Sequence, residues 1–139
     1  DLLLDESLPQ RLIDETVAKF GRLDFLVNNA GGASPVGTLA SPNLLEEFDQ
    51  VFKLNLRSVV ELTQRSVKYL EITKGNIINI GSIASIQPVC PNCCSNWNIN
   101  TLSYVGQFIR FRSKAALDMI TKTSALELGP KGIRVNSIK

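Results

Sequence analysis

The stretch 75–85, which reads Gly-Asn-Ile-Ile-Asn-Ile-Gly-Ser-Ile-Ala-Ser, constrains the fold more than any other. Three of its isoleucines are interrupted only by Asn79 and lie between Gly75 and Gly81, a pattern that predicts a short strand buried on both faces. Strands of this kind are typical of parallel sheets that helices cover. Ser82 would follow the carboxyl end of this strand, and open α/β sheets bind their ligands at that edge.

The rest of the chain alternates between predicted helices and strands. Helical periodicity is expected after Ser7 up to Gly21, over about 42–70 and over about 114–128, whereas 23–29 and 132–138 have the character of strands. Alternation at these lengths implies right-handed βαβ units and a parallel sheet. We therefore predict the α/β fold class, with a single domain over residues 1–139.

Two of the predicted helices begin with residues that are typical of helix starts. Ser7 and Gln10 have the spacing of a capping box, in which Ser7 is the N-cap. Ser41 and Pro42 resemble an N-cap followed by proline at the first helical position.

Composition and charge are those of an ordinary globular domain. Hydrophobic residues make up 44% and charged residues 20% of the 139 positions, and the net charge is +2, from 15 basic and 13 acidic residues. This balance favours neither a nucleic acid nor a membrane surface as partner. No apolar run has the length of a membrane span and no signal peptide is visible, so we expect a cytoplasmic protein, although the first residue is Asp1.

Three cysteines cluster at positions 90, 93 and 94. An odd number in one cluster is a poor framework for disulfides. The Cys-x-x-Cys spacing could begin a zinc site, but a closed site needs four ligands and the chain contains no histidine. We expect loop thiols and no metal site.

Three polar features allow both a structural and a functional interpretation. Residues 29–31, Asn-Ala-Gly, end a predicted strand and form either a plain turn or a place where a flat ligand lies close to the backbone. Asn55 has apolar residues at positions −7, −4, −3, +4 and +7, so its amide either binds a backbone carbonyl or holds a water. Lys114, at the start of a predicted helix, is either a solvated surface lysine or a group directed at an anionic ligand.

Five motifs occur together in a fixed order: Asn28-Asn29-Ala30-Gly31, Lys53-Leu-Asn55, Asn79-Ile-Gly-Ser82, Ser113-Lys114-Ala-Ala-Leu and Gly132-Ile-Arg-Val-Asn136. With this combination the chain resembles the short-chain dehydrogenases/reductases over nearly all its length, except for about residues 89–112. The resemblance implies part of a Rossmann-like, doubly wound parallel sheet that binds NAD or NADP. It also implies hydride transfer between the nicotinamide and an alcohol or carbonyl carbon of a small-molecule substrate.

Roles for individual residues follow from the resemblance alone. Ser82 would hold and polarise the substrate oxygen, and Asn55 would anchor a water in a proton relay. Lys114 would hydrogen-bond the nicotinamide ribose and lower the pKa of a catalytic tyrosine. Asn29, Ala30 and Gly31 would lie beside the adenosine half of the cofactor.

The sequence departs from the family pattern where the tyrosine is expected. Four residues before Lys114 stands Arg110, and arginine stays protonated and cannot accept a proton. The nearest tyrosine, Tyr104, is ten residues before Lys114, which on a continuous helix means about 15 Å along the axis and a different face. The alternative to an active oxidoreductase is therefore a catalytically inactive chain that at most associates with a partner.

The segment 89–112 lengthens the interval between Ser82 and Lys114 to 32 residues, which is more than the family spacing. It holds all three cysteines and the only tryptophan and has no clear periodicity. We interpret it as extra coding sequence, such as a retained intron; the alternative is a genuine substrate loop.

Residues 1–139 do not contain three other parts that the family pattern leads us to expect. The glycine-rich phosphate loop and the residue that selects NAD or NADP would precede Asp1, and loops that cover the substrate would follow Lys139. We expect the chain alone to bind cofactor weakly or not at all, with 23–29 as an exposed edge strand. Helices 42–70 and 114–128 correspond to those that pair subunits in family homo-oligomers.

Overall fold

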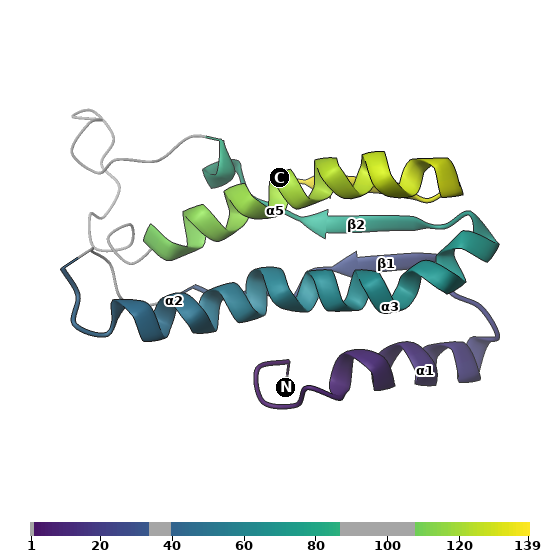
Figure 1. The fold of residues 1–139 in the computed structure, drawn as a ribbon, viewed down its shortest axis with the longest axis horizontal. Helices are drawn as coiled ribbons and strands as arrows, with labels where there is room; N and C mark the ends of the chain where they lie inside the picture. Colours follow the sequence, from purple (N-terminus) through teal and green to yellow (C-terminus); the bar gives the residue numbers. More distant parts are fainter. Residues whose placement is uncertain (1, 34–39, 87–107) are drawn as a thin grey trace.

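The structure is a computed structural model that describes residues 2–33, 40–86 and 108–139. Its main elements follow one another in the order α1 (Leu8–Phe20), β1 (Phe25–Asn28), α2 (Leu44–Phe52), α3 (Ser58–Thr73), β2 (Asn76–Ile80), α5 (Phe108–Leu128) and β3 (Arg134–Ile138) (Figure 1). Three short segments complete it: a π-helical turn η1 (Lys53–Arg57) and the 3₁₀ turns η2 (Ile83–Ser85) and η3 (Gly129–Lys131).

The three strands form one parallel sheet in the order β1-β2-β3. In the register of the sheet Val27 lies beside Ile78, which lies beside Asn136. Because the strands are parallel, their carboxyl ends meet at one edge (Figure 1). The predicted α/β class with a parallel sheet is confirmed, and β1 is an edge strand among the described residues.

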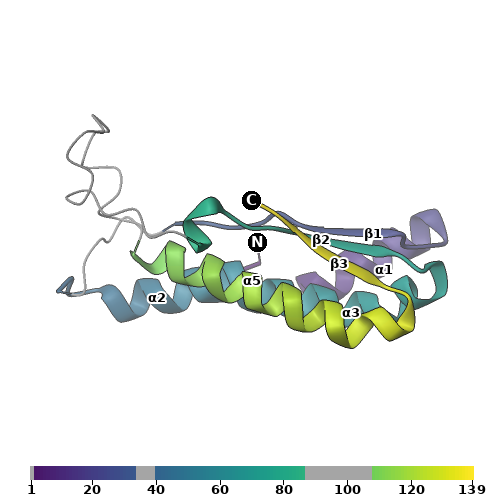
Figure 2. The same cartoon turned by 90° about the horizontal axis from the view of Figure 1, so that it is seen from above.

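The described helices cover only one face of this sheet, so the prediction of a strand buried on both faces is wrong. Figure 2 shows α3 and α5 on the same side of the strands. Ile77 on the covered face is fully buried, whereas Ile78 and Ile80 on the other face of the same strand are only half-buried. On the neighbouring strands, Phe25, Val27 and Ile138 of that other face are 62%, 54% and 56% exposed. An apolar run shows that both faces of a strand are apolar, but it does not show that both are covered.

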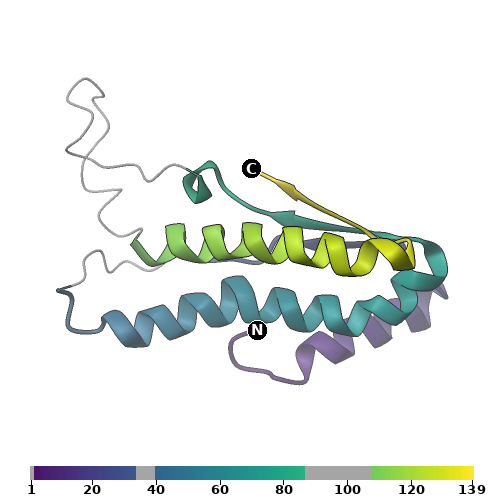
Figure 3. The ribbon, with the colours of Figure 1, turned by 45° about the horizontal axis from the view of Figure 1, so that its top comes forward.

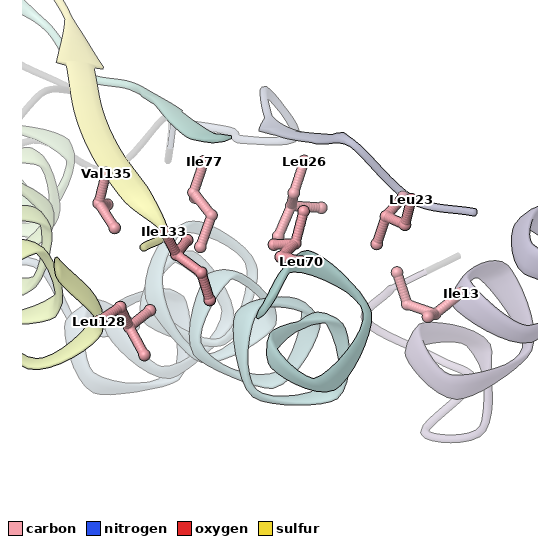
Figure 4. Packing of buried hydrophobic residues seen from close by; sticks show 8 residues of the cluster. All are labelled: Ile13, Leu23, Leu26, Leu70, Ile77, Leu128, Ile133 and Val135. Carbon is pink, nitrogen blue, oxygen red and sulfur yellow. The ribbon is translucent and has the colours of Figure 1, made fainter. Parts of the chain in front are cut away.

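The hydrophobic core lies between the covered face of the sheet and the helices (Figure 4). Leu26 and Ile77 point from the strands toward Leu70 on α3, and Ile13 reaches the same cluster from α1. The remaining members are Leu23, Leu128, Ile133 and Val135. This single cluster fixes the strands against the helices and so positions the carboxyl edge.

The predicted helix over 42–70 is an almost continuous rod made of α2, η1 and α3, and it runs beside α5 (Figure 3). The last helix begins at Phe108, six residues before the predicted start at Lys114. None of the described helices combines the length and the low charge that crossing a bilayer requires.

The helix starts differ from the predicted caps. Ser7 is the N-cap of α1, but its side chain makes no capping bond; its amide and hydroxyl both donate to Asp5. The next helix has Asn43 at its N-cap position, without a capping bond from the side chain, and begins at Leu44, so Ser41 is not its N-cap; the Ser41 backbone carbonyl accepts a bond from the Leu44 amide. At Ser7 a local turn before the helix uses the hydroxyl that the pattern assigned to the cap.

Candidate functional site

A pocket of about 320 Å³ lies at the carboxyl edge of the sheet. Three segments line it: the loop after β1 with Asn29 and 31–33, the end of β2 with residues 80–81, and α5 with Arg110 and Lys114. The glycines expose backbone, and the two side chains from α5 are cationic. The pocket thus lies where ligands bind in open α/β sheets.

Asn55 lies behind this pocket, on the π-helical turn between α2 and α3, and is only 1% exposed. Its Oδ1 accepts a hydrogen bond of 2.8 Å from the Gly32 amide, and its Nδ2 donates one of 3.0 Å to the Gly32 carbonyl. The sequence left open whether this amide binds a backbone carbonyl or holds a water, and the structure shows the bond to a backbone carbonyl. Asn55 therefore holds the loop after β1 in place.

Ser113 is a site residue that the sequence interpretation did not assign. It is fully buried, accepts a hydrogen bond of 2.9 Å from Asn55 Nδ2 and donates one of 2.8 Å to the Arg110 carbonyl. A signal was present, since Ile109, Ser113 and Leu117 stand four residues apart and all three are buried. A small polar residue within such a stripe indicates a buried hydrogen bond.

Lys114 is buried, with 7% exposure, and its Nζ donates a hydrogen bond of 2.5 Å to the Ile80 carbonyl. The interpretation as a solvated surface lysine is therefore wrong. Its pKa lies below the ordinary value because burial, and then the charge of Arg110, disfavours the ammonium, while Asp118 partly opposes this.

Asp118, one turn further along α5, does not line the pocket. Its Oδ2 accepts hydrogen bonds of 2.6 Å from Lys139 Nζ and 2.5 Å from Ser85 Oγ. Burial alone would raise the pKa of Asp118, but these bonds and the Lys139 charge leave it below its usual range. Its negative charge is already matched by Lys139.

The other predicted site residues are close in the chain but not equally close to the pocket. Asn29 and Gly31 line it, whereas Ala30 between them and Ser82 beyond Gly81 do not. The Ser82 carbonyl accepts bonds from the amide and the hydroxyl of Ser85, the last residue of the turn η2. The structure thus binds Asn55 to the loop after β1 and Lys114 to Ile80 at the end of β2, and Ser82 follows at the same edge.

The glycines of the loop after β1 form a shallow cradle. A Cβ added to Gly31 would lie 3.2 Å from Asn55 Oδ1 and 3.7 Å from Lys114 Nζ, and one added to Gly32 would lie 3.2 Å from Leu54 Cδ2. A side chain at either glycine would thus crowd Asn55 or Leu54, so this loop presents bare backbone to the pocket. The volume of the pocket is at the lower end of the range for small-molecule sites, so it suits one half of a dinucleotide rather than the whole.

Several predicted features fall outside the described residues. These are Tyr104, the three cysteines and most of the segment 89–112. Within the described ranges no tyrosine lines the pocket, and no group of three or more His, Cys, Asp or Glu residues is placed to hold a metal ion.

Comparisons with known proteins agree with the motifs. The family model described as short chain dehydrogenase matches residues 2–94. A (+)-borneol dehydrogenase 2 of Salvia officinalis is 34% identical over 99% of this chain and 44% of its own length, and an L-fucose dehydrogenase of Rattus norvegicus is 35% identical over 93% and 42%. The chain thus spans less than half the length of these curated relatives.

Solved structures share the fold. The structure of ElxO with NADP bound has a TM-score of 0.79 at 28% identity, over 99% of this chain and 49% of that one. A double variant of a Serratia marcescens short-chain dehydrogenase/reductase has a TM-score of 0.80 at 31% identity, over 100% and 49%. Both structural similarities extend over essentially the whole of this chain.

Proposed function

Because the chain belongs to the short-chain dehydrogenase family, we propose that the protein it forms is an NAD(P)-dependent oxidoreductase acting on a small-molecule alcohol or carbonyl. One observation carries the proposal: the buried ammonium of Lys114 stands beside Gly31 at the ligand-binding edge of a parallel sheet. Relatives named as dehydrogenases and the NADP-bound ElxO support it.

In this proposal the residues of the pocket hold a nicotinamide cofactor and a substrate. Lys114 donates to the nicotinamide ribose, and Asn29, Ala30 and Gly31 lie beside the adenosine half. Ser82 holds the substrate oxygen, while Asn55 supports the loop and anchors a relay water. The cofactor supplies the hydride acceptor or donor. Whether it is NAD or NADP depends on residues that the pocket does not contain.

Oxidation of an alcohol moves a hydride from carbon to the nicotinamide and must move the hydroxyl proton to a base. The residue of α5 four before Lys114 is Arg110, which lines the pocket and cannot accept that proton. We therefore propose that the chain with Arg110 binds ligand without turning substrate over, and that a tyrosine at this position would supply the base.

An association module is the second candidate. Apolar side chains on α3 and α5 are exposed, among them Val60 at 48%, Met119 at 59% and Leu126 at 79%. Contact between copies of the chain through the helices 42–70 and 114–128 would cover them. This candidate predicts a concentration-dependent dimer that forms with or without cofactor.

The segment 89–112 remains, in our proposal, an insertion that displaced the tyrosine segment of a single partial Rossmann-type domain. Sequencing the transcript against the genomic sequence tests this. A message in which splicing removes these codons supports it, and a mature message that keeps them contradicts it.

Cofactor binding separates the two functions. Fluorescence of NADH and NADPH is titrated with the purified chain, with Lys114→Met as the binding variant and the exposed Lys122→Met on the same helix as its control. Enhancement that is lost only in Lys114→Met supports the oxidoreductase proposal, even if the affinity is weak. No enhancement by a chain whose circular dichroism shows it folded favours the association module. Arg110→Tyr is then assayed for NADPH oxidation with small carbonyl compounds.

A further inference from the structure

The carboxylate of Asp118 lies next to the candidate site, and the proposed function gives it no role. Asp118 follows Lys114 by four residues on α5, so the two side chains leave the helix on the same face. Its Oδ2 accepts hydrogen bonds of 2.5 Å from Ser85 Oγ and 2.6 Å from Lys139 Nζ. The carboxylate therefore joins α5 both to the turn η2 and to the residue that follows β3.

Lys114 and Asp118 hold one short segment of the chain at two points. Lys114 Nζ donates to the carbonyl of Ile80 at the end of β2, and Asp118 accepts from Ser85, the last residue of η2. Ser82 lies between these two attachments in the chain. Its carbonyl accepts a bond of 3.0 Å from the Ser85 amide, so the place of Ser85 determines how the turn after Ser82 closes.

We propose that Asp118 is a positioning residue of the candidate site, which holds the turn that carries Ser82 against α5 through the hydroxyl of Ser85. The proposal rests on the proposed function in one respect, because there Ser82 holds the substrate oxygen and Lys114 binds the cofactor. Loss of the Asp118 carboxylate would leave Ile80 attached and release the chain only beyond it. The effect is therefore expected at the turn and not throughout the sheet.

The carboxylate is a strong acceptor for the Ser85 hydroxyl because it stays ionised. Burial alone would raise the pKa of Asp118, but the bonds from Lys139 and Ser85 and the Lys139 charge hold this pKa below its usual range. The Ser85 hydroxyl has a single hydrogen and lies within bonding distance of two acceptors, the carboxylate and the Ser82 carbonyl. A bond to an ionised oxygen is roughly twice as strong as one between neutral groups, so the carboxylate is the preferred acceptor.

Gly81 brings the carboxylate close to the pocket that it lines. A Cβ added to Gly81 would lie 3.4 Å from Asp118 Oδ1 and 2.8 Å from Ser137 Oγ. These two oxygens are buried and have no hydrogen-bond partner within the described residues, so the bonds of the carboxylate there all involve Oδ2. The charge of Asp118 also acts on Lys114, whose pKa burial and Arg110 lower and Asp118 partly restores.

Hydrogen exchange of the Ser85 amide tests the proposal, since this amide closes the turn by its bond to the Ser82 carbonyl. The purified chain is compared with Asp118→Asn, which keeps the size of the side chain and loses the charge. We expect exchange at Ser85 to become about tenfold faster, because a hydrogen bond to a charged group is lost. The Asn76 amide, bound to the Asp24 carbonyl at the start of β2, is the internal reference and should keep its rate.

Glu127→Gln is the matched control, because it removes an exposed carboxylate from the same helix. Exchange at Ser85 in this control should stay within about twofold of the unmodified chain. Equal exchange at Ser85 in the unmodified chain, Asp118→Asn and Glu127→Gln would overturn the proposal. Equal acceleration at Ser85 and Asn76 in Asp118→Asn would also overturn it, since Asp118 would then stabilise the whole fold and not the turn.

A second variant, Ser85→Ala, removes the hydroxyl and keeps the carboxylate. If Asp118 acts through Ser85, the double variant should exchange at residue 85 no faster than either single variant, because all three lack the same bond. Accelerations that multiply in the double variant contradict the proposal. Ser85→Thr keeps a hydroxyl and should exchange more slowly than Ser85→Ala. If Asp118→Asn fails to fold by circular dichroism, an unchanged rate at residue 85 in Ser85→Ala overturns the proposal.

Titration of the same variants with NADH separates this proposal from the previous one. Faster exchange at Ser85 in Asp118→Asn, without NADH binding by any of the proteins, supports the positioning role while the cofactor proposal fails for this chain. NADH binding together with unchanged exchange in Asp118→Asn has the opposite meaning.

Discussion

Asn55 and Ser113 are joined by a buried hydrogen bond of 2.9 Å between Nδ2 and Oγ, although 58 residues separate them in the chain. The same amide binds both the N–H and the C=O of Gly32. One side chain thus links the rod of α2, η1 and α3 to the loop after β1 and to α5. It fixes the residue that precedes Lys114 and the loop that faces it.

Replacing Asn55 should therefore cost more stability than replacing an exposed asparagine. We expect Asn55→Ala to lower the free energy of unfolding by about 2 kcal/mol, because buried polar groups at Gly32 and Ser113 lose their partner. Asn136→Ala is the matched control: its exposed amide makes one 3.2 Å bond to Asn76 and should cost less than about 1 kcal/mol. Urea unfolding followed by circular dichroism measures both. If the two variants lose similar amounts of unfolding free energy, the buried bonds of Asn55 stabilise the fold no more than the exposed bond of Asn136 does.

Gly75 should tolerate no side chain, for a steric reason. An added Cβ would lie 2.6 Å from the Asp24 carbonyl oxygen and 2.6 Å from Leu70 Cδ2. We expect Gly75→Ala to destabilise the chain by about 2 kcal/mol, as overpacking does. Gly129→Ala is the control, because no atom lies within 4 Å of its added Cβ. Thermal unfolding of both variants tests this, and a fully stable Gly75→Ala would mean that β2 does not approach Asp24 so closely.

The two faces of the sheet should respond differently to truncation. Ile77→Ala removes a fully buried side chain and should cost about 2–5 kcal/mol, whereas Val27→Ala, at a side chain that is 54% exposed, should cost less than about 1 kcal/mol. Chemical denaturation of the two variants gives the comparison. A large loss for Val27→Ala would reveal that something covers the open face in solution, such as a second copy of the chain.

The lowered pKa of Lys114 has a consequence for stability against pH. Between that pKa and the ordinary value of 10.5, the unfolded chain binds more protons than the folded one, so the free energy of unfolding from this group rises with pH. Arg110→Gln removes a repelling charge and should raise the pKa of Lys114. The range of pH over which this group makes the free energy of unfolding rise should therefore become narrower.

Titration of the Lys114 side chain by NMR tests the effect of Arg110→Gln on the pKa of Lys114, with Arg112→Gln as the control. The pKa should rise in Arg110→Gln and stay unchanged in the control. Equal values in the three proteins would show that Arg110 does not act on Lys114.

The fold class was predictable from local patterns because each strand and helix has a clear period. The alternation of 23–29, 42–70 and 75–81 led directly to the parallel sheet. Which face of the sheet is covered could not be read in this way, since Phe25 and Val27 are apolar and yet exposed. Coverage depends on which segments pack against a strand, and the strand sequence does not contain that information.

The candidate site was predictable only in part. The backbone bonds of Asn55 to Gly32 were one of the two alternatives that the sequence left open for its amide, and the structure shows these bonds. The burial of Lys114 was not expected, because its helix begins at Phe108 and the lysine therefore lies a turn and a half inside it. A helix start preceded by residues without periodicity gives no local signal. Ser113 did have one, its place in the four-residue spacing of Ile109, Ser113 and Leu117, but no role was assigned to it.

The uncovered face of the sheet also bears on the fate of this polypeptide in a cell. Phe25, Val27 and Ile138 present an apolar strip beside the edge of β1 that is unpaired among the described residues, which is the kind of surface that chaperones and other nascent chains recognise. Any state of the protein that leaves this strip uncovered would thus be open to such recognition, whatever the chemistry of the pocket on the adjoining edge.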